Sequence, residues 1–318
     1  MTIRKATHAG SWYSSSPARL NSQLSKFLNE APNELIKGAR ILVGPHAGFD
    51  YSGPMLARTY KAFDSKNIKR IFIMGPSHHV YYKNNVMLTG FDSYATPFGD
   101  IPVDKSTIKE LVKLDKSMFK IMDEEMDEDE HSFEMHMPFL YKVTESLQNG
   151  SPMIIPIMIS HTDELFEKKL ADYLKPYFED KENAFIISTD FCHWGSRFRY
   201  TKYTQNGKLS NLTSLNSYEG ISNTSSSLKI HESIELLDKR GMEIASTGSY
   251  SQFKSYINKT KNTICGEKPL SVLISIMEPY YPNDSDGRFK WLGYSQSNKI
   301  MYNPKDSSVS YASGYAVL

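Results

Sequence analysis

Short runs of hydrophobic residues, most of them closed by glycine, proline or serine, recur along the chain. The clearest are residues 40–44 (RILVG), 70–74 (RIFIM), 153–159 (MIIPIMI) and 184–187 (AFII). Runs of this length that are rich in isoleucine and bounded by turn residues are typical of buried strands. Because they are apolar at nearly every position, they indicate a sheet that helices cover on both faces.

Segments with helical periodicity lie between these runs. Residues 17–28 place leucine and phenylalanine side chains three and four positions apart, and similar patterns occur at 106–114, 163–177, 231–237 and 268–277. Helices that alternate with buried strands predict an α/β fold with a mixed, largely parallel sheet flanked by helices.

Length and composition narrow the class of protein. The 318 residues hold 37 Lys and Arg against 36 Asp and Glu, a formal net charge of +1. This balance argues against sequence-independent nucleic-acid binding, which needs many unpaired cations on one face. The two cysteines are too few for a disulfide-rich secreted scaffold. No secretory leader and no apolar stretch of about 18 residues can be read, so we expect an intracellular protein without a membrane span.

Chemically active side chains directly follow the predicted strands. His46 comes after the first strand, His78 and His79 after the second, and Asp190 with His193 after the fourth. Ligands of open α/β sheets bind beyond the carboxyl ends of the strands. Imidazole is a common ligand of zinc, copper and iron and the usual general base. A lone histidine is more often structural, but His46 and His78 both lie beside turn residues after buried strands, so we expect them to share a site.

Cys265 is a second candidate. It precedes the segment 268–277, which is typical of a buried helix with Pro269 in its first turn. At a helix N-terminus the dipole and the free N–H groups favour a thiolate, which is either a nucleophile or a soft metal ligand. An inert buried cysteine is the alternative. A bridge to Cys192 also stays open, although an extended segment would turn Cys192 away from its neighbours and make it a packing residue.

Two further pairs contribute acid–base groups. Asp190 and His193 could exchange protons or orient a ligand. His131 and Glu134 are three residues apart, so on a helix they share a face, and we expect His131 in a pocket. His136 does not complete the H-E-x-x-H zinc pattern and is interpreted as structural. Hydrolase-elbow, phosphate-loop and dinucleotide-binding motifs do not occur.

Two polar segments are interpreted as surface features. Residues 123–130 (DEEMDEDE) are acidic at every position but one, which is typical of a solvated loop or helix start, or else of a cation-attracting rim. Residues 205–227 are dominated by Ser, Asn, Thr and Gly. They hold too little apolar surface to pack, so we expect a disordered insertion.

Taken together, the motifs resemble those of the Memo family. The resemblance runs from about residue 4 to the end of the sequence. It implies a single domain over residues 1–318, with a fold similar to class III extradiol dioxygenases, which are non-heme iron enzymes. The chain looks like a fungal-type member in which 205–227 is an insertion. The segments that carry the resemblance are 8–13 (HAGSWY), 45–53 (PHAGFDYSG), 75–79 (GPSHH), 127–132 (DEDEHS), 188–195 (STDFCHWG), 262–266 (NTICG) and 306–311 (DSSVSY).

The resemblance also implies a mononuclear iron or copper site. The dioxygenases hold iron with two histidines and one carboxylate, whereas the matching residues here are His46, His78 and Cys265. A thiolate makes the site softer and raises its affinity for Cu(I), which puts the dioxygenase reaction in doubt. The resemblance further implies catalytic roles for Asp190, His193 and His131, and a substrate or peptide pocket lined by Trp12, Tyr51, Glu134 and His79.

Three functional hypotheses follow. The first is a metal-binding protein with redox activity toward O₂ or reactive oxygen species, acting in cell signalling, motility or invasive-type growth, in the cytoplasm and also in the nucleus. The second is a vestigial pocket that binds a peptide or phosphopeptide as a non-catalytic scaffold. The third is a hydrolase in which Cys265 is the nucleophile and His193 its base.

Overall fold

A nine-stranded mixed sheet forms the centre of the computed structural model, which describes residues 1–147, 150–216, 228–280 and 289–317. Its strands follow the order β10-β14-β2-β9-β3-β8-β4-β7, and β13 also pairs with β14. Their bounds are β2 (Ala39–Gly44), β3 (Arg70–Pro76), β4 (Val86–Leu88), β7 (Phe119–Ile121), β8 (Met153–Ile159), β9 (Asn183–Ser188), β10 (His193–Trp194), β13 (Lys290–Gln296) and β14 (Ser308–Val317).

The four central strands, β2, β9, β3 and β8, are parallel and are the four strands that the hydrophobic runs predict. β2 and β9 are buried at every position, as a strand covered on both faces should be. The neighbours on either side, β14 and β4, run antiparallel to β2 and β8. The predicted α/β fold with a mixed sheet is therefore confirmed, and its parallel part is this centre.

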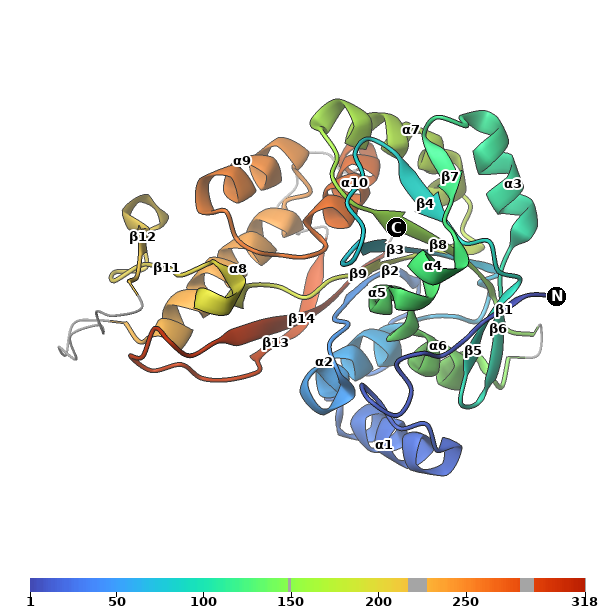
Figure 1. Cartoon of the computed structure of the whole chain (residues 1–318), viewed down its shortest axis with the longest axis horizontal. Coiled ribbons are helices and arrows are strands. Elements are labelled where there is room, and N and C mark those ends of the chain that lie inside the picture. Colours follow the sequence, from blue (N-terminus) through green and yellow to red (C-terminus); the bar gives the residue numbers. More distant parts are fainter. Residues whose placement is uncertain (148–149, 217–227, 281–288, 318) are drawn as a thin grey trace.

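Helices cover both faces of the sheet (Figure 1). α7 and α10 pack together on one face, against β9 and β3, whereas α1, α2 and α6 lie on the other. All five predicted helices are present, each within a few residues except that α8 extends well beyond residue 237. The helices are α1 (Pro17–Glu30), α2 (Phe49–Ala62), α3 (Lys105–Leu114), α4 (Glu124–Asp129), α5 (His131–Glu134), α6 (Met137–Thr144), α7 (Glu164–Glu179), α8 (Ile230–Ser246), α9 (Tyr250–Thr260) and α10 (Glu267–Met277).

Smaller elements complete the chain. A three-stranded sheet pairs β1 (Ile3–Arg4) with β5 (Ser93–Thr96), and β5 with β6 (Gly99–Pro102). Short 3-10 turns, η1 (Ser196–Phe198), η2 (Leu209–Asn211) and η3 (Glu278–Tyr280), lie in the connections. No helix in the described ranges combines the length and the hydrophobicity that a bilayer span requires.

The polar segment 205–227 departs in part from the expected disorder. Strand β12 (Thr213–Ser214) pairs with β11 (Lys202–Tyr203), and η2 precedes it. Within this segment Leu209 and Leu215 are partly buried and pack against neighbouring apolar clusters. Residues 217–227 lie outside the described part of the chain.

Candidate metal centre

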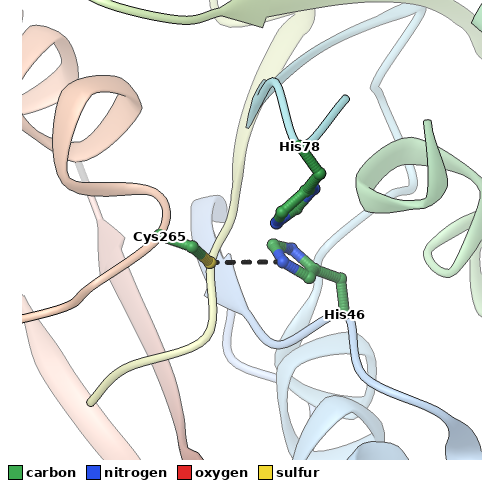
Figure 2. Close-up of side chains that lie close together, drawn as sticks. All are labelled: His46, His78 and Cys265. Atoms are coloured by element: carbon green, nitrogen blue, oxygen red, sulfur yellow. Dashed lines mark hydrogen bonds between the residues drawn. The ribbon is translucent and has the colours of Figure 1, made fainter. Parts of the chain in front are cut away.

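Three side chains from distant parts of the sequence point toward one another at the carboxyl edge of the parallel strands (Figure 2). His46 follows β2, His78 follows β3, and Cys265 lies two residues before α10. One donor atom of each lies within 4.8 Å of the others, and Cys265 Sγ is 3.2 Å from His46 Nε2. Because β2 and β3 are both parallel to β9, their ends bring the two histidines to one place.

His46 is held in one tautomer by a serine. Its Nδ1 is 2.7 Å from the Ser188 Oγ, and that hydroxyl donates its own proton to the Ser132 carbonyl at 2.6 Å. Ser188 must therefore accept the Nδ1 proton of His46, which leaves a lone pair on Nε2. The ring is buried, and burial, together with the neighbouring histidines, holds its pKa well below the ordinary value. His46 is thus the neutral imidazole that a metal ion needs.

His78 is oriented by a buried carboxylate. Its Nδ1 lies 2.8 Å from the Glu130 Oε1, and its backbone N–H donates to the other oxygen at 2.8 Å. Burial opposes protonation of His78, but the hydrogen bonds to Cys265 and Glu130 outweigh it and raise its pKa to about 10. The Nδ1–H of His78 points at the carboxylate, so its Nε2 faces the pocket.

Cys265 lies at the start of α10 but is a thiol in the protein alone. Its Sγ accepts the Asp190 backbone N–H at 3.2 Å. Burial nevertheless raises the pKa of the thiol, although the contact with His78 opposes this. Burial of the sulfur therefore opposes the thiolate that the helix N-terminus favours. Both cysteines are free, and Cys192 is fully buried in an apolar cluster, as a packing residue should be.

Asp190 and His193 stand beside the three ligands. The carboxylate of Asp190 accepts the His46 backbone N–H at 2.9 Å, and burial raises its pKa. His193 Nδ1 contacts the carbonyl oxygens of Phe191 at 2.9 Å and Thr263 at 3.1 Å. Since carbonyls only accept, Nδ1 carries the proton and Nε2 is left as an acceptor.

A stack of rings forms one wall of the centre. The His131 ring lies over His78 with 4.2 Å between centroids, and Trp12 lies against His131 at 4.4 Å. Trp12 is 37% exposed, so it stands at the mouth. Burial lowers the pKa of His131 to about 3, which keeps this ring neutral. His79 is exposed and farther out, 6.4 Å from His131 between centroids.

Glu134 does not line the pocket, contrary to the expectation. It is fully buried, and its carboxylate binds the Arg4 guanidinium at 2.7 Å and the Tyr13 hydroxyl at 2.9 Å. His8 Nδ1 is 2.9 Å from the same carboxylate, and its ring lies 5.8 Å from that of His131. The side chain faces inward because the buried arginine needs an anion, so Glu134 reaches the pocket only through His8.

Tyr51 borders a separate cavity beside the centre. The tyrosine is 63% exposed and lines a cavity of about 300 Å³. Phe198 contacts the His193 ring at 5.2 Å and lines the same cavity, which therefore opens next to the proposed catalytic residues. Arg197 lies over Phe198 and makes no ion pair within the described ranges. The remaining lining residues are Ser297, Asn298, Ser307, Ser308, Val309 and Tyr311.

The acidic segment 123–130 is only half solvated, which corrects the surface interpretation. Glu124 and Glu125 are exposed, but Asp127 and Glu130 are buried. Asp127 binds Arg4 at 3.0 Å, and Glu130 binds His78. The segment is acidic partly because two of its carboxylates are buried against partners, one against the buried Arg4 guanidinium and one against His78.

Sequence reasoning missed the residues that support the ligands. Glu130 and Ser188 were not singled out, although both lie inside the quoted motifs 127–132 and 188–195. Composition alone does not show which acid of a run faces inward. The signal for Glu130 was its place one residue before His131, a predicted pocket residue.

The donor set fits a first-row transition metal. One imidazole nitrogen of His46, one of His78 and the Cys265 sulfur converge from three segments; the His46 lone pair is free, whereas His78 must first release a proton. Three protein donors leave room for an external ligand, as in catalytic rather than purely structural sites. Imidazole and thiolate together suit iron, copper or zinc rather than magnesium or calcium.

The fold and this cluster define an α/β protein with a His–His–Cys centre at the carboxyl edge of its parallel strands. The model of the family described as Memo-like protein matches residues 4–315. The chain is 38% identical to the MEMO1 family protein MHO1 of Saccharomyces cerevisiae, with all of both chains covered. It is 39% identical to human protein MEMO1, over 99% of this chain and 97% of the human one. The chain therefore belongs to the Memo-like family.

Among solved structures, an uncharacterized protein from Escherichia coli is similar at a TM-score of 0.45 and 11% identity. The match covers 86% of this chain and 98% of that one. A likeness at this level carries no argument about function.

Proposed function

We propose that this Memo-family chain binds one iron or copper ion through His46, His78 and Cys265 and has redox activity toward O₂ or reactive oxygen species. The observation that supports this most is the convergence of the three donor atoms within 4.8 Å. Ser188 and Glu130 add to it, because each binds an Nδ1 atom and thereby turns the Nε2 atoms of His46 and His78 toward the centre. Such an ion supplies one-electron chemistry at an open coordination position.

The residues around the ligands would manage protons and water. Asp190, whose pKa is raised by burial, can hold a proton close to the centre. His193 Nε2 can accept one, because Nδ1 is fixed as the donor. His131 and Trp12 cover one side of the pocket and would exclude water from it. A likeness to class III extradiol dioxygenases, a role in cell signalling, motility or invasive-type growth, and a cytoplasmic and nuclear location stay predictions that accompany this proposal.

A second candidate is a non-catalytic peptide or phosphopeptide scaffold. The cavity beside His193 favours it, because Arg197 and several hydroxyl groups line its wall. An arginine without an acidic partner suits a phosphate group. The hydrolase hypothesis has less support, since burial raises the pKa of the Cys265 thiol and the imidazoles in contact with its sulfur are those of His46 and His78, not His193.

Metal binding is tested by anaerobic purification, addition of Fe(II) or Cu(I), and measurement of bound metal with a competing chelator. Cys265→Ser and His46→Ala should each lose most of the bound ion. Ser188→Ala should weaken binding by about 10- to 100-fold, because it frees the tautomer of His46. His161→Ala is the matched control, since His161 also follows a strand but is exposed outside the cluster. If Cys265→Ser, His46→Ala and Ser188→Ala retain as much metal as the His161→Ala control, the proposal is wrong.

The two candidates separate in one comparison. Cys265→Ser should abolish O₂-dependent oxidation but spare phosphopeptide binding. Arg197→Gln should abolish phosphopeptide binding but spare the O₂-dependent oxidation. Redox activity that survives in Cys265→Ser would remove the metal-centred mechanism, whereas peptide binding that survives in Arg197→Gln would remove the scaffold.

A further inference from the structure

Strand β7 forms one edge of the central sheet, and α3 lies beside it (Figure 1). Lysines and apolar side chains of this region line a groove. Its volume is about 400 Å³, within the range of ligand pockets in proteins, about 300–1,000 Å³. None of the residues that line it belongs to the metal centre. The lining residues are Gly90, Lys105, Ile108, Lys109, Val112, Lys113, Lys116 and Ile121.

One face of α3 supplies most of the groove. Positions 105, 108, 109, 112 and 113 follow helical spacing, so their side chains lie side by side. Ile108 and Val112 form an apolar floor, and Ile121 of β7 forms the opposite wall. Ile121 is 48% exposed, although an edge strand is usually protected by polar side chains. The far wall is therefore exposed apolar surface, and in the floor Val112 is partly exposed whereas Ile108 is buried.

The charged side chains that line the groove are all lysines. Lys105 donates to the Gly90 carbonyl and pairs with Asp92 at 3.8 Å, which closes one end. Lys109, Lys113 and Lys116 are exposed and make no ion pair within the described ranges. No acidic side chain lines the groove. The acids that flank α3 face elsewhere, since Asp115 binds Lys169 at 2.8 Å and Glu110 accepts from Tyr177 at 3.3 Å.

We infer that this groove binds a free, single-chain anionic amphiphile of the fatty-acid class. The hydrocarbon tail would lie on Ile108, Val112 and Ile121, and the carboxylate would meet the lysine ammonium groups. The methylene stems of lysines often cover apolar surface. Such coverage does not by itself produce a concave site of ligand size. A concave site fits a single hydrocarbon chain better than it fits the flat surface of a bilayer. The shape therefore favours a monomeric ligand over a membrane. This inference does not depend on the metal centre.

Dodecanoate, used below its micelle concentration, is the test ligand, and binding is measured by isothermal titration calorimetry on the full chain. Hexanoate is six methylenes shorter, and each buried methylene contributes a factor of about four, so hexanoate should bind about 60-fold more weakly when three of the six are buried. Dodecanol, which has the same tail without the charge, should bind about tenfold more weakly. Equal binding of dodecanoate and hexanoate would overturn the tail contact, and equal binding of dodecanoate and dodecanol would overturn the head contact.

Two variants locate the site. A triple variant should weaken dodecanoate binding about tenfold, because it removes three exposed ammonium groups that would pair with the carboxylate. Its substitutions are Lys109→Gln, Lys113→Gln and Lys116→Gln. Val112→Glu, which places an anion on the half-exposed floor, should abolish binding and keep the native circular dichroism spectrum. The charge-matched control replaces the exposed Lys66, Lys259 and Lys299 by Gln and should leave binding unchanged.

A photoreactive dodecanoate should label α3 and β7 in the wild-type chain and in Cys265→Ser alike. Labelling elsewhere would refute the groove. Loss of labelling in Cys265→Ser would show that binding belongs to the metal centre instead. Binding to anionic phospholipid vesicles with no binding of monomeric dodecanoate would replace the inference with a membrane contact.

Discussion

At the scale of single residues, the state of His78 decides how tightly an ion can bind. Its pKa of about 10 means that it carries a proton at neutral pH. Because the neighbouring Cys265 thiol is itself protonated, the Glu130 carboxylate is the lasting anionic partner of that proton. A metal ion must displace both protons, one from His78 and one from Cys265. The carboxylate thus orients the ligand and at the same time opposes the ion at low pH.

Glu130→Gln should change the pH dependence of metal binding. Apparent affinity rises about tenfold per pH unit for each displaced proton, so the wild-type chain should gain about a hundredfold per unit between pH 6.5 and 8.5. In Glu130→Gln the pKa of His78 falls toward its ordinary value, and the gain should drop to about tenfold per unit. Chelator competition at three pH values measures it, and exposed Glu124→Gln is the control. An unchanged slope in Glu130→Gln would contradict the role of the carboxylate.

At the scale of elements, the junction between β9 and α10 places the sulfur. Gly266 separates Cys265 from the helix, and its backbone N–H donates to the Thr189 hydroxyl at 2.9 Å. A Cβ atom at this position would lie 2.4 Å from the Thr189 Cβ and 2.8 Å from the Ser188 carbonyl oxygen. Both neighbours belong to the segment that also orients His46. The close approach of helix and strand therefore fixes two ligands together.

Gly266→Ala should separate α10 from the end of β9. The overlap requires a backbone shift, so the free energy of unfolding should fall by about 1–3 kcal/mol and metal affinity should fall with it. Urea denaturation and chelator competition measure the two effects. Gly90→Ala is the control, because a Cβ there meets its nearest neighbour at an ordinary 3.4 Å. Metal affinity equal to that of the wild type would show that the junction does not position the sulfur.

Elements of this fold were predictable where the apolar pattern is strong. The buried runs at 40–44 and 184–187 match β2 and β9 closely, because strands covered on both faces have few polar positions. Their ends then predicted where His46 and Asp190 would lie. The inward direction of Glu130 and Glu134 was not predictable, since it depends on Arg4 and His78, which are far away in sequence. Long-range ion pairs leave no local periodicity.

At the scale of the whole molecule, the N-terminal segment is tied to the core by one buried arginine. Arg4 donates to Asp127 at 3.0 Å, to Glu134 at 2.7 Å and to the Glu130 carbonyl at 2.8 Å. The chain then continues to Trp12, whose carbonyl accepts the Phe49 N–H at the start of α2. Both anchors hold Trp12 at the mouth of the metal centre.

Arg4→Gln should therefore destabilise the protein by about 3–5 kcal/mol at pH 7, because it leaves two buried carboxylates without their cation. The Arg4 and His8 contacts lower the pKa of Glu134 to about 2 against the effect of burial, so their stabilisation is present above its ordinary pKa and is lost as pH falls toward 2. The difference from the wild type should stay nearly constant from pH 7 to pH 5 and shrink between pH 5 and pH 3 in urea denaturation. Arg19→Gln, at an exposed position, is the control and should change the free energy of unfolding little at any of these pH values. A loss of stability in Arg4→Gln that does not depend on pH would contradict the ion pairing.

The order of the strands has a consequence for biosynthesis. β14, which follows every other described strand in sequence, lies inside the sheet and pairs with β2, the strand that leads to His46. A nascent chain on the ribosome therefore exposes the edge of β2 until residues 308–317 have emerged, and it lacks the sulfur until residue 265 has emerged. A chain that stops before residue 265 can hold an ion with two histidines at most. If the proposed site binds metal, complete loading must therefore wait until both Cys265 and β14 have been synthesised.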